Sequence, residues 1–132
     1  MIVLDASVLI GHLDGQDPHH ARARALLEAS DAEPLGASTI TLAETLVAPA
    51  RVGRLGEARA ALERLGVNEL VLGEDAPGRL AQLRADTGRK LPDCCVLLAA
   101  RERSGAVASF DAGLLGAARK LGLGIAEAGQ RT

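Results

Sequence analysis

Short apolar segments alternate with longer amphipathic segments along the chain, and this alternation constrains the fold more than any other feature. Strand-like runs are expected at residues 2–4, 35–38, 69–72, 106–110 and 125–126. Strands that alternate with helices are typical of an α/β fold with a parallel sheet, because each parallel connection needs a crossover. With 132 residues, the chain is sized for a single domain, which we place at residues 1–132.

Helices are expected between these strands, where apolar residues recur at helical spacing. The expected helices lie at residues 6–13, from Asp17 to about residue 28, and at 39–48, 51–65, 74–87, 92–103 and 111–121. Asp17-Pro18 is expected to open the second helix, and the segment 39–48 is expected to be mostly buried. Pro49 is expected to end or kink that helix.

Composition excludes several functional classes. Fifteen Lys and Arg against seventeen Asp and Glu give a net charge of −2, whereas a dedicated duplex-binding domain is usually strongly basic. One Phe, with no Trp or Tyr, cannot build the aromatic platform of single-strand binders. The apolar runs are too short for a membrane span and no basic leader precedes the first one, so we expect a cytoplasmic protein without a membrane partner. Cys94 and Cys95 lie without metal-ligand spacing and are expected to be buried packing residues.

Four acidic residues differ from the others because they are embedded in apolar sequence. Asp5 follows Ile-Val-Leu, Glu44 lies within Leu-Ala-Glu-Thr-Leu, Asp93 follows Leu-Pro, and Asp111 follows Ala-Ser-Phe. Each has a local structural alternative. The three aspartates precede expected helices, as N-caps do, and Glu44 has the spacing of a capping box with Thr41.

The expected topology brings these acids to one place. Asp5 and Asp111 end two strands, Asp93 begins a buried helix at the same end, and Glu44 can point toward them. Close carboxylates repel by roughly 4 kcal/mol per pair at an effective dielectric of about 20, so such a cluster needs cations. Ligands that are all oxygen favour Mg²⁺ or Mn²⁺, and one or two such ions provide what phosphodiester hydrolysis requires.

At these residues the sequence resembles the PIN-domain nucleases. The resemblance rests on Val-Leu-Asp-Ala-Ser-Val-Leu-Ile at residues 3–10, the Glu44 helix, Leu-Pro-Asp at 91–93 and Ser-Phe-Asp at 109–111, and it covers essentially the whole chain. In size and layout the chain is most similar to the toxin ribonucleases of VapBC toxin–antitoxin pairs. The resemblance implies a PIN-like three-layer α/β domain, with a short-stranded parallel sheet flanked by helices, and a Mg²⁺- or Mn²⁺-dependent endoribonuclease.

The functional residues of that family carry over one by one. Asp5, Glu44, Asp93 and Asp111 match its catalytic, metal-binding acids. Ser109 matches a small hydroxyl residue expected to orient a carboxylate or a metal-bound water, and Ser7 either does similar work or caps the first helix. Many relatives have a further acid soon after the last motif, but here Ala-Gly-Leu follows Asp111, so one ion or two remain possible.

Basic residues near the acids are candidates for binding the RNA backbone. Arg89 and Lys90 precede Asp93, and Arg51 and Arg54 follow the Glu44 helix; the alternative is that they are ordinary solvated side chains. The adjacent His19 and His20 lack metal-ligand spacing and are expected to be exposed polar residues.

The resemblance also implies partners. They are an RNA substrate such as transfer or ribosomal RNA, and a small antitoxin that covers the acidic site and contributes any DNA binding. A second copy of the chain in a homodimer is the third, with the helices of residues 39–65 or the C-terminal helix as candidate interfaces. A non-enzymatic alternative stays open, in which the same fold works without turnover as an RNA-binding or protein-binding regulatory module.

Overall fold

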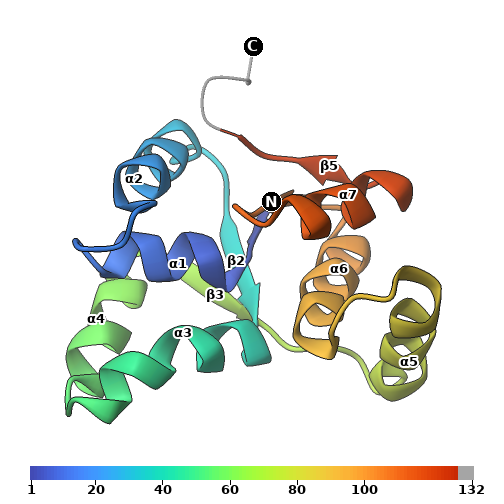
Figure 1. Cartoon of the computed structure of the whole chain (residues 1–132), viewed down its shortest axis with the longest axis horizontal. Helices are drawn as coiled ribbons and strands as arrows, with labels where there is room; N and C mark the ends of the chain where they lie inside the picture. The colour runs from blue at the N-terminus through green and yellow to red at the C-terminus, as the bar shows by residue number, and fades with distance from the viewer. Residues whose placement is uncertain (128–132) are drawn as a thin grey trace.

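A computed structural model describes residues 1–127 as a five-stranded sheet with helices packed on both faces (Figure 1). The strands are β1 (Ile2–Leu4), β2 (Leu35–Ser38), β3 (Val67–Leu70), β4 (Ala106–Ala108) and β5 (Gly124–Ile125). The helices are α1 (Ala6–Leu13), α2 (His20–Ala29), α3 (Thr39–Arg51), α4 (Leu55–Leu65), α5 (Ala76–Thr87), α6 (Leu91–Arg103) and α7 (Ala112–Lys120).

The sheet is parallel throughout, with the order β3-β2-β1-β4-β5. The chain first adds strands on one side of β1 and then returns to add β4 and β5 on the other. In open α/β sheets, ligands bind outside the carboxyl ends of the strands at such a reversal point. Asp5 directly follows β1 and Ser109 directly follows β4, and the backbone N–H of Asp5 donates to the carbonyl of Ala108 (2.9 Å). The fold therefore places these two segments side by side at the reversal point.

Two hydrophobic cores lie on opposite faces of the sheet. The alternating side chains of β1 serve both, since Val3 packs with residues of α5, α6 and α7, while Ile2 and Leu4 pack with residues of α1, α2 and α4. Helix α6 is buried along its middle from Cys94 to Ala100. This arrangement confirms the expected three-layer α/β architecture.

The buried face of α3 differs from the prediction. Its buried side chains are Thr41 and Thr45, whereas Ile40 and Val47 are 46% and 43% exposed. Threonine is tolerated inside because its hydroxyl finds a local partner, as when Thr45 Oγ1 donates to the carbonyl of Thr41 (2.8 Å). The expectation of a mostly buried apolar helix was therefore wrong, and α3 leaves apolar side chains at the surface.

Several helix boundaries also differ from the prediction, and α4 begins at Leu55 and not at residue 51. Helix α3 continues through Pro49 to Arg51. Pro49 lies in the last turn, so its missing N–H removes one hydrogen bond only near the end of the helix. The carbonyl of Pro49 accepts from the N–H of Arg54 (2.8 Å). Helix α2 begins at His20 and not at Asp17. Asp17 caps the preceding turn instead, since its Oδ1 accepts from the N–H of His19 (2.8 Å).

The two cysteines are buried and not bonded to each other, as predicted, and burial raises the pKa of both thiols. No helix within residues 1–127 combines the length and hydropathy needed to cross a membrane.

Candidate metal and active site

Asp5 is held by two serine hydroxyls at the carboxyl end of β1. Its side chain is 8% exposed, and its Oδ2 accepts from Ser109 Oγ (2.7 Å) and from Ser7 Oγ (2.8 Å). The serines are fixed in turn, because Ser109 Oγ accepts from the N–H of Asp111 (2.9 Å) and Ser7 Oγ from that of Phe110 (3.1 Å). Asp5 makes no side-chain cap to α1. Both serine hydroxyls therefore bind the carboxylate of Asp5, which is one of the two alternatives expected for each serine.

Asp93 lies in the first turn of the buried helix α6 without capping it. The N-cap residue is Lys90, and it makes no side-chain cap either. Asp93 Oδ2 instead accepts two hydrogen bonds from the guanidinium of Arg89, from Nη2 (2.8 Å) and Nε (3.1 Å). The capping alternative for Asp93 is therefore wrong.

Asp111 combines the capping role with a place in the site. Its Oδ1 accepts from the N–H groups of Gly113 (2.8 Å) and Leu114 (3.2 Å) and so caps α7. Its Oδ2 accepts from Arg89 Nη2 (2.9 Å). The capping alternative is right for this residue, and it accounts for only one of the two carboxylate oxygens.

Glu44 reaches the site from α3, and within the described residues no hydrogen bond holds its exposed carboxylate. The N-cap of α3 is Ser38, whose Oγ accepts from the N–H of Thr41 (3.2 Å), so the predicted capping box is wrong. Burial raises the pKa of Glu44, and the charges of Asp5 and Asp93 raise it further. The acid on α3 therefore faces the two acids that follow β1 and begin α6.

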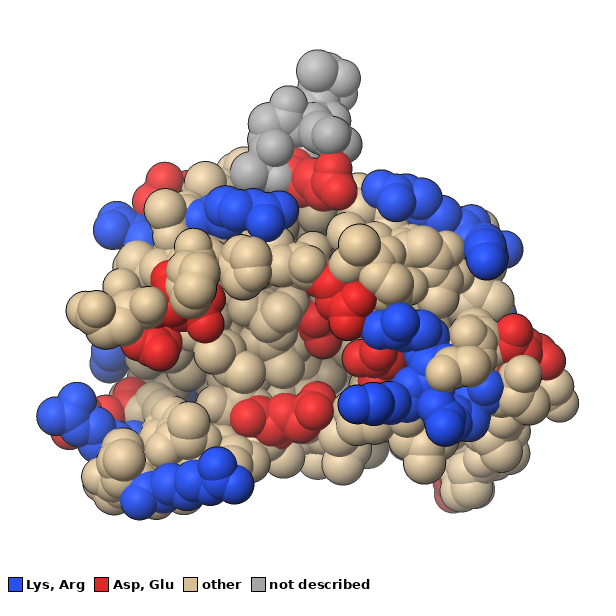
Figure 2. Space-filling view, in the orientation of Figure 1, with Lys and Arg blue, Asp and Glu red and all other residues tan. Residues whose placement is uncertain are grey.

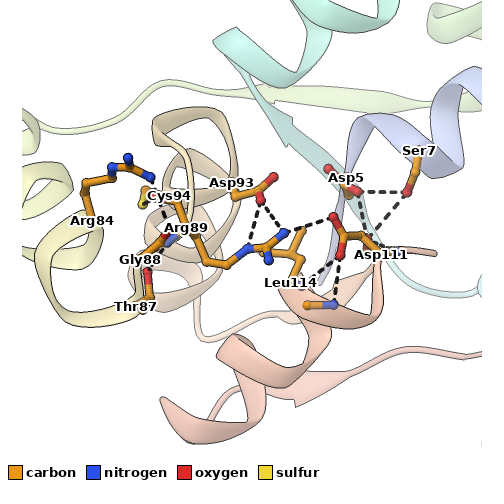
Figure 3. A network of polar contacts seen from close by, with 12 residues as sticks. Asp5, Ser7, Arg84, Thr87, Gly88, Arg89, Asp93, Cys94, Asp111 and Leu114 are labelled. Carbon is orange, nitrogen blue, oxygen red and sulfur yellow. Dashed lines mark hydrogen bonds and ion pairs between the residues drawn. The ribbon is translucent and has the colours of Figure 1, made fainter.

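Arg89, one of the predicted candidates for binding the RNA backbone, is paired with two acids of the site. Figure 3 shows its guanidinium between the carboxylates of Asp93 and Asp111, with Asp5 close by, and its side chain is only 27% exposed. The hydrogen bond to Asp93 is the main cause that raises the pKa of Arg89. The four-residue spacing of Arg89 and Asp93 was the sequence signal for this ion pair.

The other basic candidates remain at the surface. Lys90, Arg51 and Arg54 are exposed. In Figure 2, acidic side chains gather in the middle of the face where α3, α6 and α7 converge, and basic side chains adjoin them on the α5–α6 side. This surface is acidic at its centre and basic at one border.

The histidine pair is not exposed as expected. His19 packs its ring against Phe110, with the ring centroids 4.9 Å apart, and Arg22 lies 4.6 Å from the centroid of the same Phe110 ring. His20 Nδ1 lies 2.8 Å from the carbonyl of Gly11. Both histidines are partly buried. The sequence analysis missed this small cluster beside the acids, because its members are distant in the chain.

The donor chemistry of the acids fits a hard divalent cation. Asp5 Oδ1, Asp93 Oδ1 and the carboxylate of Glu44 accept no hydrogen bond within the described residues, and such oxygens are the ligands that Mg²⁺ and Mn²⁺ prefer. As the side chains stand, no three acidic, histidine or cysteine residues among 1–127 surround one point closely enough to hold an ion. Ion binding therefore requires side-chain movement, and Glu44 is the acid that can turn without breaking a hydrogen bond in the described residues.

Comparison with known proteins agrees with this architecture. The family model of the PIN domain matches residues 2–120. Among solved structures, a toxin–antitoxin complex from Klebsiella pneumoniae is 24% identical with a TM-score of 0.67, covering 84% of this chain and 87% of its own. VapC20 of Mycobacterium tuberculosis, described as a sarcin-ricin loop cleaving toxin, is 19% identical with a TM-score of 0.74, covering 89% and 95%. FitAcB of Neisseria gonorrhoeae is 23% identical with a TM-score of 0.70, covering 99% and 100%.

A search of curated protein sequences found no significant match. The likenesses to solved structures show a shared fold, and the family match extends over most of the sequence. With residues 2–120 matched, this chain belongs to the PIN domain family.

Proposed function

We propose that this chain is a Mg²⁺- or Mn²⁺-dependent endoribonuclease and the toxin of a toxin–antitoxin pair. The observation that carries the proposal is the convergence of Asp5, Glu44, Asp93 and Asp111 at the reversal point of the sheet, from four separate segments of the chain. A structural role explains only part of this arrangement, because Asp5, Glu44 and Asp93 make no helix cap.

The residues of the site have distinct roles in this proposal. Asp5, Glu44 and Asp93 would hold the divalent ion through their unpartnered oxygens. Ser7 and Ser109 fix one oxygen of Asp5, which leaves its other oxygen without a hydrogen bond in the described residues. When bound, the ion supplies an activated water and neutralises charge on the phosphodiester. The exposed Lys90 is the basic residue we assign to backbone phosphates beside the acids, with Arg51 and Arg54 as more distant contacts.

The toxin role is supported by relatives described as toxins or toxin–antitoxin complexes. A groove of about 580 Å³ lies between α1, α3 and α4 and extends from Glu44 to Val52 and Ala61. We assign it to a segment of a small antitoxin, since an occupant would lie against Glu44 and thereby reach the acids. DNA binding would come from that antitoxin, and transfer or ribosomal RNA is the substrate class we propose. We also propose that the chain forms a homodimer, that it is located in the cytoplasm, and that residues 1–132 form a single domain.

The direct test is cleavage of total and transfer RNA by purified chain freed of any antitoxin. Wild type should give discrete fragments with Mg²⁺ or Mn²⁺ and none with EDTA. Asp5→Asn and Asp93→Asn, each checked for folding by circular dichroism, should lower cleavage at least about a hundredfold, since even outer-shell changes at metal sites cost 10- to 100-fold. Glu63→Gln, which neutralises an exposed acid on α4, is the matched control and should cut like wild type.

The outcomes separate the two functional classes. Metal-dependent fragments that disappear in both aspartate variants support the nuclease. Tight RNA or antitoxin binding without cleavage under any metal condition would contradict it and favour the regulatory module without turnover.

A further inference from the structure

The guanidinium of Arg89 lies between two carboxylates, in a space that a glycine of α7 leaves open. It makes ion pairs with Asp93 Oδ2 (2.8 Å) and Asp111 Oδ2 (2.9 Å), two acids from the starts of different helices. The neighbouring position in α7 is Gly113, where a Cβ atom would collide with Arg89 Nη1 and lie 3.0 Å from its Cζ. Glycine at this position therefore leaves the space into which the guanidinium fits.

The oxygens of the four acids divide into two groups. Both oxygens of Asp111 are engaged, one by the α7 cap and one by Arg89. Asp5 and Asp93 each keep one oxygen without a hydrogen bond in the described part of the chain, and Glu44 keeps both. One side of the site therefore offers oxygen ligands, while the Asp111 side already holds a positive charge.

We propose that Arg89 takes the place of a second cation, so that the chain binds one divalent ion through Asp5, Glu44 and Asp93 while Asp111 stays paired with Arg89. This inference rests on the proposed function for the identity of the metal site. A guanidinium is permanently charged and offers a planar set of donors to carboxylate or phosphate oxygens. Arg89 thus positions Asp93 and Asp111 and holds a fixed positive charge where a bound phosphodiester would need one.

The test is the number of Mn²⁺ ions bound per chain, measured by isothermal titration calorimetry and by electron paramagnetic resonance of free Mn²⁺. Wild type should bind one ion. Arg89→Gln should bind two, because the carboxylates of Asp93 and Asp111 lose their cation, and its first ion should bind about tenfold tighter because a nearby positive charge is gone. Asp111→Asn should still bind one ion with affinity close to that of wild type, and asparagine keeps the α7 cap.

A second variant moves the guanidinium without removing it. Gly113→Ala places a methyl group against the flexible end of Arg89, so the arginine should swing away and a second ion should bind. Gly116→Ala is the matched control in the same helix, since nothing lies within 4 Å of its added Cβ. Arg101→Gln is the matched charge control, because Arg101 is exposed in the last turn of α6 and makes no ion pair with the acids within the described residues. Both controls should bind one ion like wild type.

Two ions on wild type, or unchanged stoichiometry and affinity in Arg89→Gln, would overturn the role of Arg89. Loss of binding in Asp111→Asn would also overturn it. If wild type binds two ions and cuts RNA, only this inference falls and the proposed nuclease stands. If wild type binds no ion, both fall.

Discussion

Replacing Ser109 with alanine should destabilise the ion-free protein by about 2.5–4 kcal/mol. Ser109 Oγ donates to the carboxylate of Asp5 (2.7 Å) and accepts from the N–H of Asp111 (2.9 Å). The first bond is charge-assisted and contributes about 1.5–3 kcal/mol, and the second contributes about 1 kcal/mol. Because Ser109 is only 3% exposed, water cannot readily replace either partner in the alanine variant.

The assay is urea and thermal unfolding of wild type, Ser109→Ala, Ser109→Thr and Ser7→Ala in EDTA. Ser109→Ala should lower the melting temperature by roughly 5–15 °C, and Ser109→Thr should recover most of the loss because it keeps the hydroxyl. Ser7 also bonds to Asp5 but is less buried, so Ser7→Ala should cost less, about 1–2 kcal/mol.

Two results would refute this reasoning. A Ser109→Ala protein within about 0.5 kcal/mol of wild type would mean that the hydrogen bonds contribute nothing net. Equal losses in the alanine and threonine variants would mean that packing, and not the hydroxyl, determines stability at this position. In parallel, the Mn²⁺ affinity of Ser109→Ala should fall about 10- to 100-fold, as expected when the partner that orients a metal ligand is lost.

Three further predictions follow from other contacts. Glu44→Gln should raise the melting temperature of the ion-free protein at pH 7, because the folded-state pKa of Glu44 is raised and its charged form costs stability above the ordinary value of 4.5. The gain is roughly a few tenths of a kcal/mol because solvent screens the group, and melting curves in a pH series should show it vanish below about pH 4. Asp93→Asn should abolish metal-dependent cleavage yet stay folded, with a loss of about 0.5–1 kcal/mol from its ion pair with Arg89, and an unfolded variant by circular dichroism would show a structural role instead. Gly36→Ala should cost about 1–3 kcal/mol in urea unfolding, because its Cβ would lie 2.7 Å from Cδ1 of the buried Leu70, and Leu70→Val should restore part of that loss; a single variant as stable as wild type would contradict the overpacking.

Much of the fold was predictable because its strands are short apolar runs that end in polar residues. Asp5 directly follows β1, as predicted, whereas β4 ends at Ala108, two residues before the predicted strand end, so Ser109 lies after the strand and not within it. The burial of α3 was not predictable in the same way. Its apolar residues suggested an inward face, but the helix turns Thr41 and Thr45 inward and leaves Ile40 and Val47 exposed. The packing of α3 against the rest of the protein determines which of its side chains are buried, and hydrophobicity alone does not predict that choice.

The four acids of the proposed site can be named from the sequence, whereas their hydrogen-bond partners cannot. The sequence offers an N-cap role as one alternative for Asp111. It does not show that one carboxylate oxygen caps α7 while the other accepts a hydrogen bond from Arg89. That division depends on the end of β4 lying beside the start of α6, which only the sheet order determines. The placement of Arg89 also depends on Gly113, which the sequence shows only as one of the non-acidic residues that follow Asp111.

The unequal anchoring of the four acids has a consequence for how such a chain loses activity under selection. Asp5 binds the hydroxyls of two serines and Asp111 starts a helix, whereas Glu44 holds nothing in place within the described residues. Under the proposed function, loss of the Asp5 carboxylate would damage both chemistry and folding, and a residue at position 111 that cannot cap α7 would damage folding, while loss of Glu44 would damage chemistry alone. If the protein is expressed in cells that it harms, survivors that still accumulate full-length, folded protein should carry substitutions at Glu44 more often than at Asp5 or Asp111. Such inactive but folded chains would keep the groove between α1, α3 and α4, and under the proposed function they would compete with the active form for the antitoxin.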